Sequence, residues 1–172
     1  MLTNILHRAF RLLFQKKRAE MRQQYHRVLP ANELLTDRWE KARYLGFGEG
    51  ASIYDSSLVF GDVVVGANTW VGPFAVLDGS GGLSIGGHCS ISTGVQIYTH
   101  DTVQWALSGG TAPYEYSPTS IGDRCYIGPN TIIGKGVTLG EGCVVGANSF
   151  VNQSFPPGSK VAGSPAHAIS QS

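Results

Sequence analysis

The stretch that decides the fold is residues 121–151, which read IGDRCY IGPNTI IGKGVT LGEGCV VGANSF V. An aliphatic residue returns at every sixth position, with glycine one place after it and a small residue four places after it. A six-residue period fits neither an α-helix, at about 3.6 residues per turn, nor a lone strand, at two. It is typical of a short strand followed by a corner, repeated many times, and therefore predicts a β-solenoid.

The same period extends back to Ile53. Counting gives five hexads from Ile53, three from Ile85 and six from Ile121, fourteen in all. At three hexads per triangular coil, this predicts a little under five coils, each rising about 4.8 Å. Two irregularities interrupt the count: residues 78–84 hold an excess of two residues, and Val103–Ser120 abandons the period. Insertions at solenoid corners often carry function.

Alternation along each short strand predicts which side chains face the core. If the excursion replaces no hexad, the inward-facing Cys89, Cys125 and Cys143 form a ladder of free, buried thiols on adjacent coils. The positions five places after each aliphatic residue point outward, and many are apolar: Leu58, Trp70, Val76, Tyr126, Ile132, Val144 and Phe150. So much exposed apolar surface needs a partner, and a closed homo-oligomer packed flank to flank supplies one.

Composition indicates one globular unit of 172 residues, 42% hydrophobic and 15% charged. Three cysteines do not make a disulfide framework, and the N-terminus lacks both an apolar signal region and a small-residue cleavage site, so we expect a cytoplasmic location. The net charge of +1 conceals an asymmetry, because residues 1–28 hold seven Lys and Arg against Glu20 alone. The remainder of the chain therefore carries −5.

We expect a helical N-terminal segment over residues 1–48, the solenoid over 50–157 with its excursion at 103–120, and a C-terminal tail over 158–172. Apolar residues at helical spacing between Leu2 and Leu13 predict a basic amphipathic helix. A shorter helix is expected between Thr36, as N-cap, and Gly46. Residues 1–28 can contact an anionic membrane peripherally, or the basic helix can cap the first coil or pack on a neighbour.

The C-terminal repeats resemble a known family. Residues 145–151 (VGANSFV) and 156–166 (PPGSKVAGSPA) are similar to the end of a hexapeptide-repeat acyltransferase. Together with Thr99-His100 and residues 115–122 (EYSPTSIG), they most resemble the maltose and galactoside O-acetyltransferase branch, over about residues 50–168. The resemblance implies a left-handed parallel β-helix, a homotrimer, acetyl-CoA as the donor and active sites in grooves between subunits.

His100 breaks the repeat at the fourth place of its hexad, and Asp101 follows where a small inward residue is expected. Imidazole is well suited to take a proton near neutral pH from a hydroxyl or amine that attacks a thioester. His100 also matches the family's catalytic histidine, so we interpret it as the general base; the alternative is a surface histidine at a loop entrance. Asp101 and Glu115 either orient His100 or are solvated loop carboxylates.

Asp78 stands second in the hexad that begins at Leu77, on the face that carries His100, one coil earlier. We expect its side chain to point outward, where it contacts acceptor hydroxyls or positions His100, unless it is an ordinary turn residue. The excursion adds Trp105, Tyr114 and Tyr116, whose rings suit a sugar face or burial against a neighbouring subunit.

For the donor, the resemblance implies a CoA groove on the later coils, made by Tyr126, Pro129, Ala147, Asn152, Gln153, Ala162, Gly163 and His167. Asn152-Gln153 stands where Thr-Lys is common in the family, and His167 where Arg or Lys is common. Both differences remove positive charge near the expected phosphates. Lys135 and Lys160 either compensate or are solvated corner residues.

We therefore predict a CoA-dependent O-acetyltransferase that acts on a sugar hydroxyl in bacterial cell-surface polysaccharide synthesis. The alternatives are an N-acetyltransferase acting on a nucleotide-linked amino sugar and a non-catalytic hexapeptide scaffold. No metal is expected, because His88, His100 and His167 lack the spacing of a zinc site. No nucleic-acid partner is expected.

Overall fold

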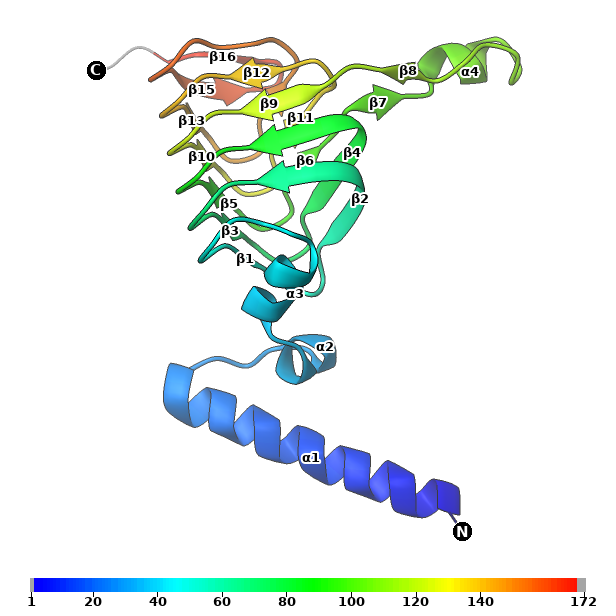
Figure 1. Cartoon of the computed structure of the whole chain (residues 1–172), viewed down its shortest axis with the longest axis vertical. Coiled ribbons are helices and arrows are strands. Elements are labelled where there is room, and N and C mark those ends of the chain that lie inside the picture. The colour runs from blue at the N-terminus through cyan, green and yellow to red at the C-terminus, as the bar shows by residue number, and fades with distance from the viewer. Residues whose placement is uncertain (1, 170–172) are drawn as a thin grey trace.

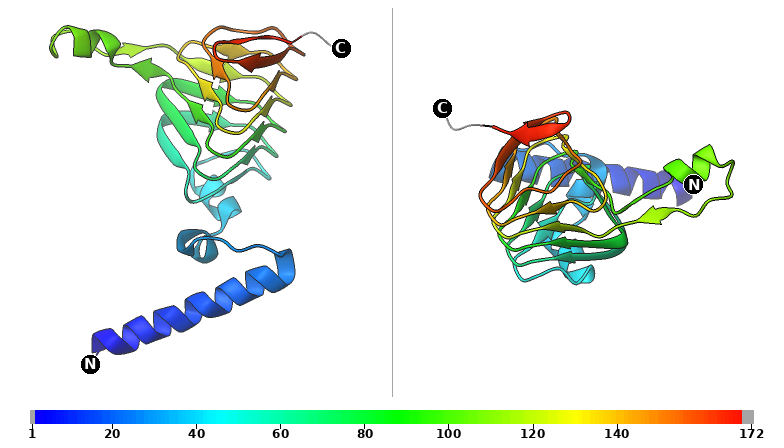
Figure 2. Two further views of the ribbon diagram at one scale, coloured as in Figure 1. Left: turned by 180° about the vertical axis from the view of Figure 1, so that it is seen from behind. Right: turned by 90° about the horizontal axis from the view of Figure 1, so that it is seen from above.

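A computed structural model describes residues 2–169 (Figure 1). Three helices come first: α1 (Leu2–Tyr25), α2 (Ala31–Leu35) and α3 (Arg38–Tyr44). Short parallel strands then stack into a solenoid whose axis follows the long axis of the molecule (Figures 1 and 2). The predicted fold class, a left-handed parallel β-helix preceded by helices, is confirmed.

Three faces build the solenoid. The first face holds β1 (Ser52–Ile53), β3 (Trp70–Val71), β5 (Ser90–Ile91), β10 (Tyr126–Ile127), β13 (Val144–Val145) and β15 (Lys160–Gly163), with β16 (Ala166–Ala168) antiparallel at its end. The second holds the first halves of β2 (Leu58–Val65) and β4 (Val76–Ile85), then β6 (Gln96–Ile97), β11 (Ile132–Ile133) and β14 (Phe150–Val151). The third holds the second halves of β2 and β4, then β9 (Thr119–Ile121) and β12 (Thr138–Leu139).

The solenoid is longer than the hexad count predicts, with about six turns. Phe155 bridges to Leu139, and Val161 pairs with Val145, so the stack continues past residue 151. The count missed these residues because the six-residue spacing stops at Val151, whereas the pairing of strands does not. Residues 160–168, assigned to the tail from sequence, thus lie on the first face.

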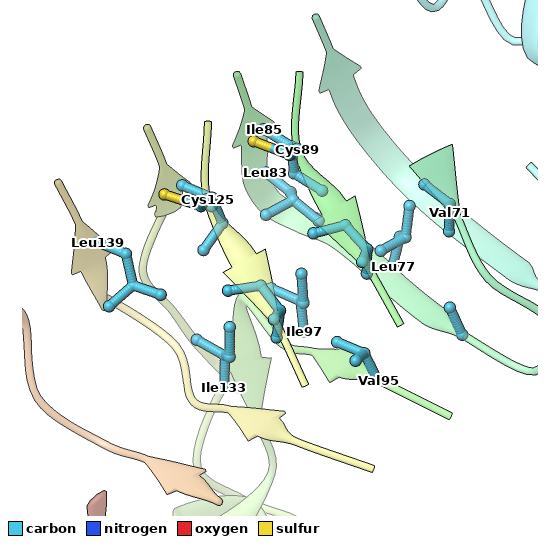
Figure 3. Close-up of a cluster of buried hydrophobic side chains, with 14 of the residues drawn as sticks. Val71, Leu77, Leu83, Ile85, Cys89, Val95, Ile97, Cys125, Ile133 and Leu139 are labelled. Carbon is cyan, nitrogen blue, oxygen red and sulfur yellow. The ribbon is translucent and has the colours of Figure 1, made fainter. Parts of the chain in front are cut away.

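The hexad aliphatics fill the interior (Figure 3). Leu77, Ile97 and Ile133 have no exposed surface. Tyr126 pairs with Ser90 on one side and Val144 on the other, so the cysteine that precedes each of these residues lies on an adjacent turn. All three cysteines are buried and free, which confirms the predicted thiol ladder; Figure 3 shows its first two members, Cys89 and Cys125.

The N-terminal end of the solenoid is closed by α2 and α3. The Lys41 ammonium donates to the carbonyls of Tyr54, Asp55 and Ser57 at 3.2, 2.9 and 2.9 Å. The buried carboxylate of Glu33 accepts from the backbone N–H of Asp55 at 3.1 Å. The capping role that the sequence left open for the basic helix is therefore filled by the two shorter helices.

The start of α3 corrects one prediction. Asp37, not Thr36, is the N-cap, because its carboxylate accepts from the backbone N–H groups of Trp39 and Glu40 at 2.8 and 3.0 Å. Thr36 instead forms the C-cap of α2, and its hydroxyl donates back to the carbonyl of Asn32 within that helix. Among the helices of residues 2–169, none combines the length and apolar character needed to cross a membrane.

Candidate active site

The two interruptions of the repeat meet at the corner between the second and third faces. Between β2 and β4, Gly61 pairs with Gly79 and Val63 with Leu83, so the two extra residues of β4 bulge at this corner. Ile85 pairs with Ile121, which shows that the excursion replaces no hexad. The excursion leaves the same corner one turn later: β7 (His100–Asp101) leads into it, and it contains α4 (Val103–Leu107) and β8 (Glu115–Tyr116).

Asp78 and His100 form the centre of this corner. Nδ1 of His100 lies 2.6 Å from Oδ2 of Asp78. The same oxygen accepts the backbone N–H of Thr99 at 2.9 Å, while Oδ1 accepts the N–H and hydroxyl of Ser80 at 3.1 and 2.6 Å. Asp78 is only 2% exposed, so the prediction that it points outward is wrong. The carboxylate is instead turned toward Thr99 and His100 on the next turn.

The hydrogen bonds keep Asp78 ionised. Burial by itself raises the pKa of Asp78, but hydrogen bonds from Ser80, Thr99 and His100 outweigh it and hold that pKa well below its usual range. A carboxylate only accepts hydrogen bonds, so the Nδ1 atom that faces it carries the imidazole proton in the neutral ring. Nε2 of His100 is then left as the acceptor, on a side chain that is 30% exposed.

Aromatic side chains of the excursion cover His100. The rings of Tyr116 and Tyr114 lie nearly parallel to the imidazole, with centroids 5.8 and 6.4 Å away. Trp105 meets Tyr114 edge-on at 5.7 Å. Of the residues predicted for the acceptor, the structure thus brings Tyr114 to the candidate base, and Trp105 contacts Tyr114.

Asp101 and Glu115 do not orient His100. They pair across β7 and β8, where the Lys135 ammonium lies 2.9 Å from Asp101 and also contacts Glu115. These contacts raise the pKa of Lys135, and the hydrogen bond from Lys135 lowers the pKa of Asp101. Lys135 comes from the solenoid turn after that of His100. It therefore joins that turn to the neck of the excursion, the paired strands β7 and β8, and its ammonium is already paired with two carboxylates instead of being available to bind a phosphate.

The other residues predicted for the CoA groove lie on the last turns. Tyr126 and Lys160 point outward from the first face, where both strands pair with β13. The carbonyl of Pro129 accepts the N–H of Asn148, the residue after Ala147, at the corner that follows the first face.

The remaining members of the predicted groove lie near the C-terminal hairpin. Ala162 pairs with His167 across β15 and β16, with Gly163 next to it. The Gln153 amide donates to the carbonyl of Ala166 at 3.1 Å, and its neighbour Asn152 is exposed. Asn152 and Gln153 follow β14 of the second face, whereas Tyr126, Lys160 and the hairpin belong to the first, so the predicted donor residues are split between two faces of the solenoid.

The first face lies opposite the corner that carries His100. In Figure 1 the strands β1, β3, β5, β10 and β13 run along one edge, and the excursion projects from the other. Within one chain, Tyr126 and Lys160 are therefore on the far side of the solenoid from His100. Within residues 2–169, no three His, Cys, Asp or Glu side chains converge on a point where they would hold a metal ion.

The chain is similar in sequence and fold to several known acyltransferases. A family model described as bacterial transferase hexapeptide (six repeats) matches residues 118–153. AntD, an N-acyltransferase from Bacillus cereus in complex with dTDP and 3-hydroxybutyryl-CoA, is 27% identical, with a TM-score of 0.65 over 72% of this chain and 70% of that one. A maltose O-acetyltransferase from Clostridium difficile is 26% identical, with a TM-score of 0.60 over 94% and 83%. The resemblance to hexapeptide-repeat acyltransferases is confirmed.

The prediction that the protein is an acyltransferase is confirmed. A hexapeptide-repeat acetyltransferase from Vibrio cholerae, 22% identical with a TM-score of 0.53 over 95% of this chain and 90% of that one, shows the shared fold. In this acyltransferase the sequence analysis missed Ser80 and Thr99, the residues that hold Asp78. The available signal was the two-residue excess, which marks a place where the chain leaves the regular path.

Proposed function

We propose that this acyltransferase is a CoA-dependent O-acetyltransferase that moves an acetyl group from acetyl-CoA to a sugar hydroxyl. The observation that carries the proposal is the 2.6 Å contact between Nδ1 of His100 and the buried carboxylate of Asp78. That contact fixes the ring and leaves Nε2 as an acceptor beside the aromatic excursion. A carboxylate behind an imidazole also stabilises the imidazolium that forms when the base takes a proton.

The chemistry follows directly from this pair. Nε2 of His100 accepts the proton of the acceptor hydroxyl while that oxygen attacks the thioester carbonyl carbon of acetyl-CoA. The tetrahedral intermediate collapses by breaking the C–S bond, and the imidazolium returns its proton to the departing sulfur of CoA. The products are an acetyl ester and CoA, and His100 is regenerated.

The acceptor side of the site is the excursion. Trp105, Tyr114 and Tyr116 offer flat rings with polar tips, which suit the faces and hydroxyls of a carbohydrate. Asp101 and Glu115 give the neck its shape through Lys135 and border the acceptor. We assign this acceptor to bacterial cell-surface polysaccharide synthesis in the cytoplasm.

The donor groove is shared between subunits of a homotrimer in this proposal. Tyr126 and Lys160 lie across the solenoid from His100, so they meet a histidine only when it belongs to a neighbouring subunit. A mostly apolar column on the second face supports association: Leu58, Ile132 and Phe150 are 53%, 37% and 38% exposed, Val76 is half-buried, and the polar Gln96 lies between Val76 and Ile132. Ile132→Glu with Phe150→Glu should split the trimer in sedimentation velocity and abolish turnover.

A second candidate is acyl transfer to the amine of a nucleotide-linked sugar. AntD is an N-acyltransferase, and one of its structures contains dTDP-4-amino-4,6-dideoxyglucose. The same base and donor serve both reactions, because an attacking amine also loses a proton.

The test is acetyl-CoA consumption by the purified full-length protein with a panel of free, nucleotide-linked and lipid-linked sugars. Matched pairs that differ only in a hydroxyl or an amine at one carbon separate the two candidates. We expect turnover with a hydroxyl acceptor and release of one CoA per ester formed. Turnover confined to amino sugars would replace the first candidate with the second. Failure of every acceptor, with tight binding of CoA absent, would remove both.

A further inference from the structure

Helix α1 presents an unpartnered apolar stripe. Ile5, Leu6, Phe10 and Leu13 are 61%, 61%, 55% and 45% exposed. At about 100° per residue, these side chains lie on one side of the helix. The helix projects from the base of the solenoid, whose end is already closed by α2 and α3 (Figures 1 and 2). The stripe therefore has no cover within residues 2–169.

The opposite side of α1 is strongly basic. Arg8, Arg11, Arg18 and Arg22 lie within about 80° of one another around the helix. Lys16 and Lys17 follow directly after the apolar stripe, and Glu20 is the one acidic residue of the helix. Residues 1–28 carry +6, seven basic residues less one acidic, against −5 for the rest of the chain.

A second copy of α1 is a poor occupant of this stripe. Along the stripe the apolar spacing ends at Phe14 and gives way to Lys16 and Lys17, so it spans about two heptads, fewer than the three or four that a coiled coil sustains. Packing copies of the helix together would also gather cations with one carboxylate each. A surface that is apolar below and anionic above fits both sides of the helix at once.

Aromatic residues add to this end of the molecule. A cavity of about 290 Å³ where α1 meets α2 and α3 is lined by Tyr25, Arg38 and Trp39, among others. Tyr25 and Trp39 are 54% and 44% exposed, and the Arg38 guanidinium stacks on the Trp39 ring at 4.1 Å. Tyr and Trp favour the level of the lipid headgroups, where one end of the ring is apolar and the other is wet.

We propose that α1 lies flat in the surface of an anionic lipid bilayer, with the apolar stripe among the acyl chains and the arginines at the phosphates. Because α1 runs crosswise to the solenoid (Figure 1), a helix in the plane of the bilayer makes the solenoid stand away from it. The negative charge of the rest of the chain opposes contact with the same surface. Membrane binding thus orients the enzyme, and this inference does not rest on the identity of the acyl acceptor.

The experiment is co-sedimentation of the full-length protein with vesicles of phosphatidylcholine, alone or with about 30% phosphatidylserine. We expect binding to the anionic vesicles only, falling steeply between 50 and 500 mM salt. Arg8→Gln with Arg11→Gln should weaken binding about 10- to 30-fold, and Phe10→Glu with Leu13→Glu should reduce it at least as much. Turnover of a soluble acceptor serves as a separate readout and should stay unchanged in both variants.

Matched controls lie outside α1. Leu35→Glu removes an exposed apolar residue of α2, and Arg43→Gln removes an exposed cation of α3; both should bind vesicles as the wild type does. Equal binding to neutral and anionic vesicles, or no loss in the α1 variants, would overturn the proposal. So would a change of oligomeric state in the Phe10 and Leu13 variant, because the stripe would then cover a second copy.

Discussion

The turns from Ile121 to Val151 are regular, because their hexads follow one another without interruption. The turns from Leu77 to Ile121 follow the same repeat but are irregular, because they contain the two-residue excess and the excursion. In the regular turns a glycine follows each aliphatic residue from Ile121 to Val145; a Cβ at Gly128, for example, would lie 2.6 Å from the backbone nitrogen of Ala147. After Leu77, in the irregular turns, that place is taken by Asp78, and the register shift of the bulge follows directly after Gly79. The regular turns form the scaffold, and the candidate catalytic pair, Asp78 and His100, lies in the irregular turns.

The backbone around the bulge is closely packed at two of its glycines. A Cβ at Gly79 would lie 2.1 Å from the carbonyl oxygen of Asp62, and one at Gly81 would lie 2.5 Å from that of Thr99. A side chain at either glycine would therefore displace the neighbouring backbone, whereas Asp78 and Leu83 of the same stretch are buried without such a clash. The comparison teaches that an insertion in a solenoid can position a residue as firmly as the repeat itself.

The largest expected effect comes from His100→Ala in the irregular turn. Loss of a positioned general base lowers turnover by about 10²- to 10⁴-fold. Turnover, CoA affinity and sedimentation are measured on one preparation, and the last two should match the wild type. Near-normal turnover would show that the irregular turn is not the catalytic one.

Asp78→Asn is expected to cost less, about 10- to 100-fold in turnover, because the base remains while its orientation and tautomer are lost. Asp78 acts through His100, so the pH profile of turnover should change as well as its height. Asp78→Glu tests placement, since the carboxylate is retained but displaced. An unchanged pH profile in Asp78→Asn would assign the carboxylate a structural role alone.

The same residue predicts how stability depends on pH. The folded-state pKa of Asp78 is lowered, chiefly because hydrogen bonds from Ser80, Thr99 and His100 outweigh the effect of burial. Its stabilisation is therefore present above the unfolded pKa, about 3.9, and is lost as pH falls through the folded value. Urea unfolding between pH 6 and pH 3 should show a smaller loss of stability in Asp78→Asn than in the wild type. An identical loss in both would contradict this linkage.

Lys135→Met tests the neck of the excursion. Without the ammonium, Asp101 and Glu115 repel each other across β7 and β8, so we expect KM for the acceptor to rise about 3- to 10-fold with little change in kcat. Arg124→Gln, which removes the exposed ion pair with Glu141 on a regular turn, is the matched control and should leave both constants unchanged. Equal behaviour of the two variants would erase the distinction between the regions.

The smallest effect on activity is expected from the thiol ladder, of which Cys125 and Cys143 lie on the regular turns. Cys125→Ala should leave turnover unchanged and lower the free energy of unfolding by about 1 kcal/mol, because a buried sulfur is lost. In the native wild type, all three thiols should react slowly with a thiol reagent and rapidly in denaturant. Fast native labelling would show that these turns open.

The regular part of the molecule could be predicted in detail because each hexad repeats a local rule. An aliphatic residue that must be buried, with glycine where the next turn comes too close, determines strand, corner and register without distant information. The thiol ladder, the outward apolar column and the excursion at Val103–Ser120 all follow from counting. His100 could be singled out because it breaks the count.

Only the tertiary structure decided how side chains are oriented where the repeat is interrupted. Counting placed Asp78 beside His100 but aimed it outward, since alternation cannot describe a bulge whose path depends on packing against Thr99 in the next turn. The family resemblance led us to interpret Lys135 as a compensating charge for the donor or as a solvated corner residue, whereas pairing of β7 with β8 brings two carboxylates to that ammonium. Local spacing determines a repeat; contacts between turns, which spacing does not encode, decide where an inserted side chain points.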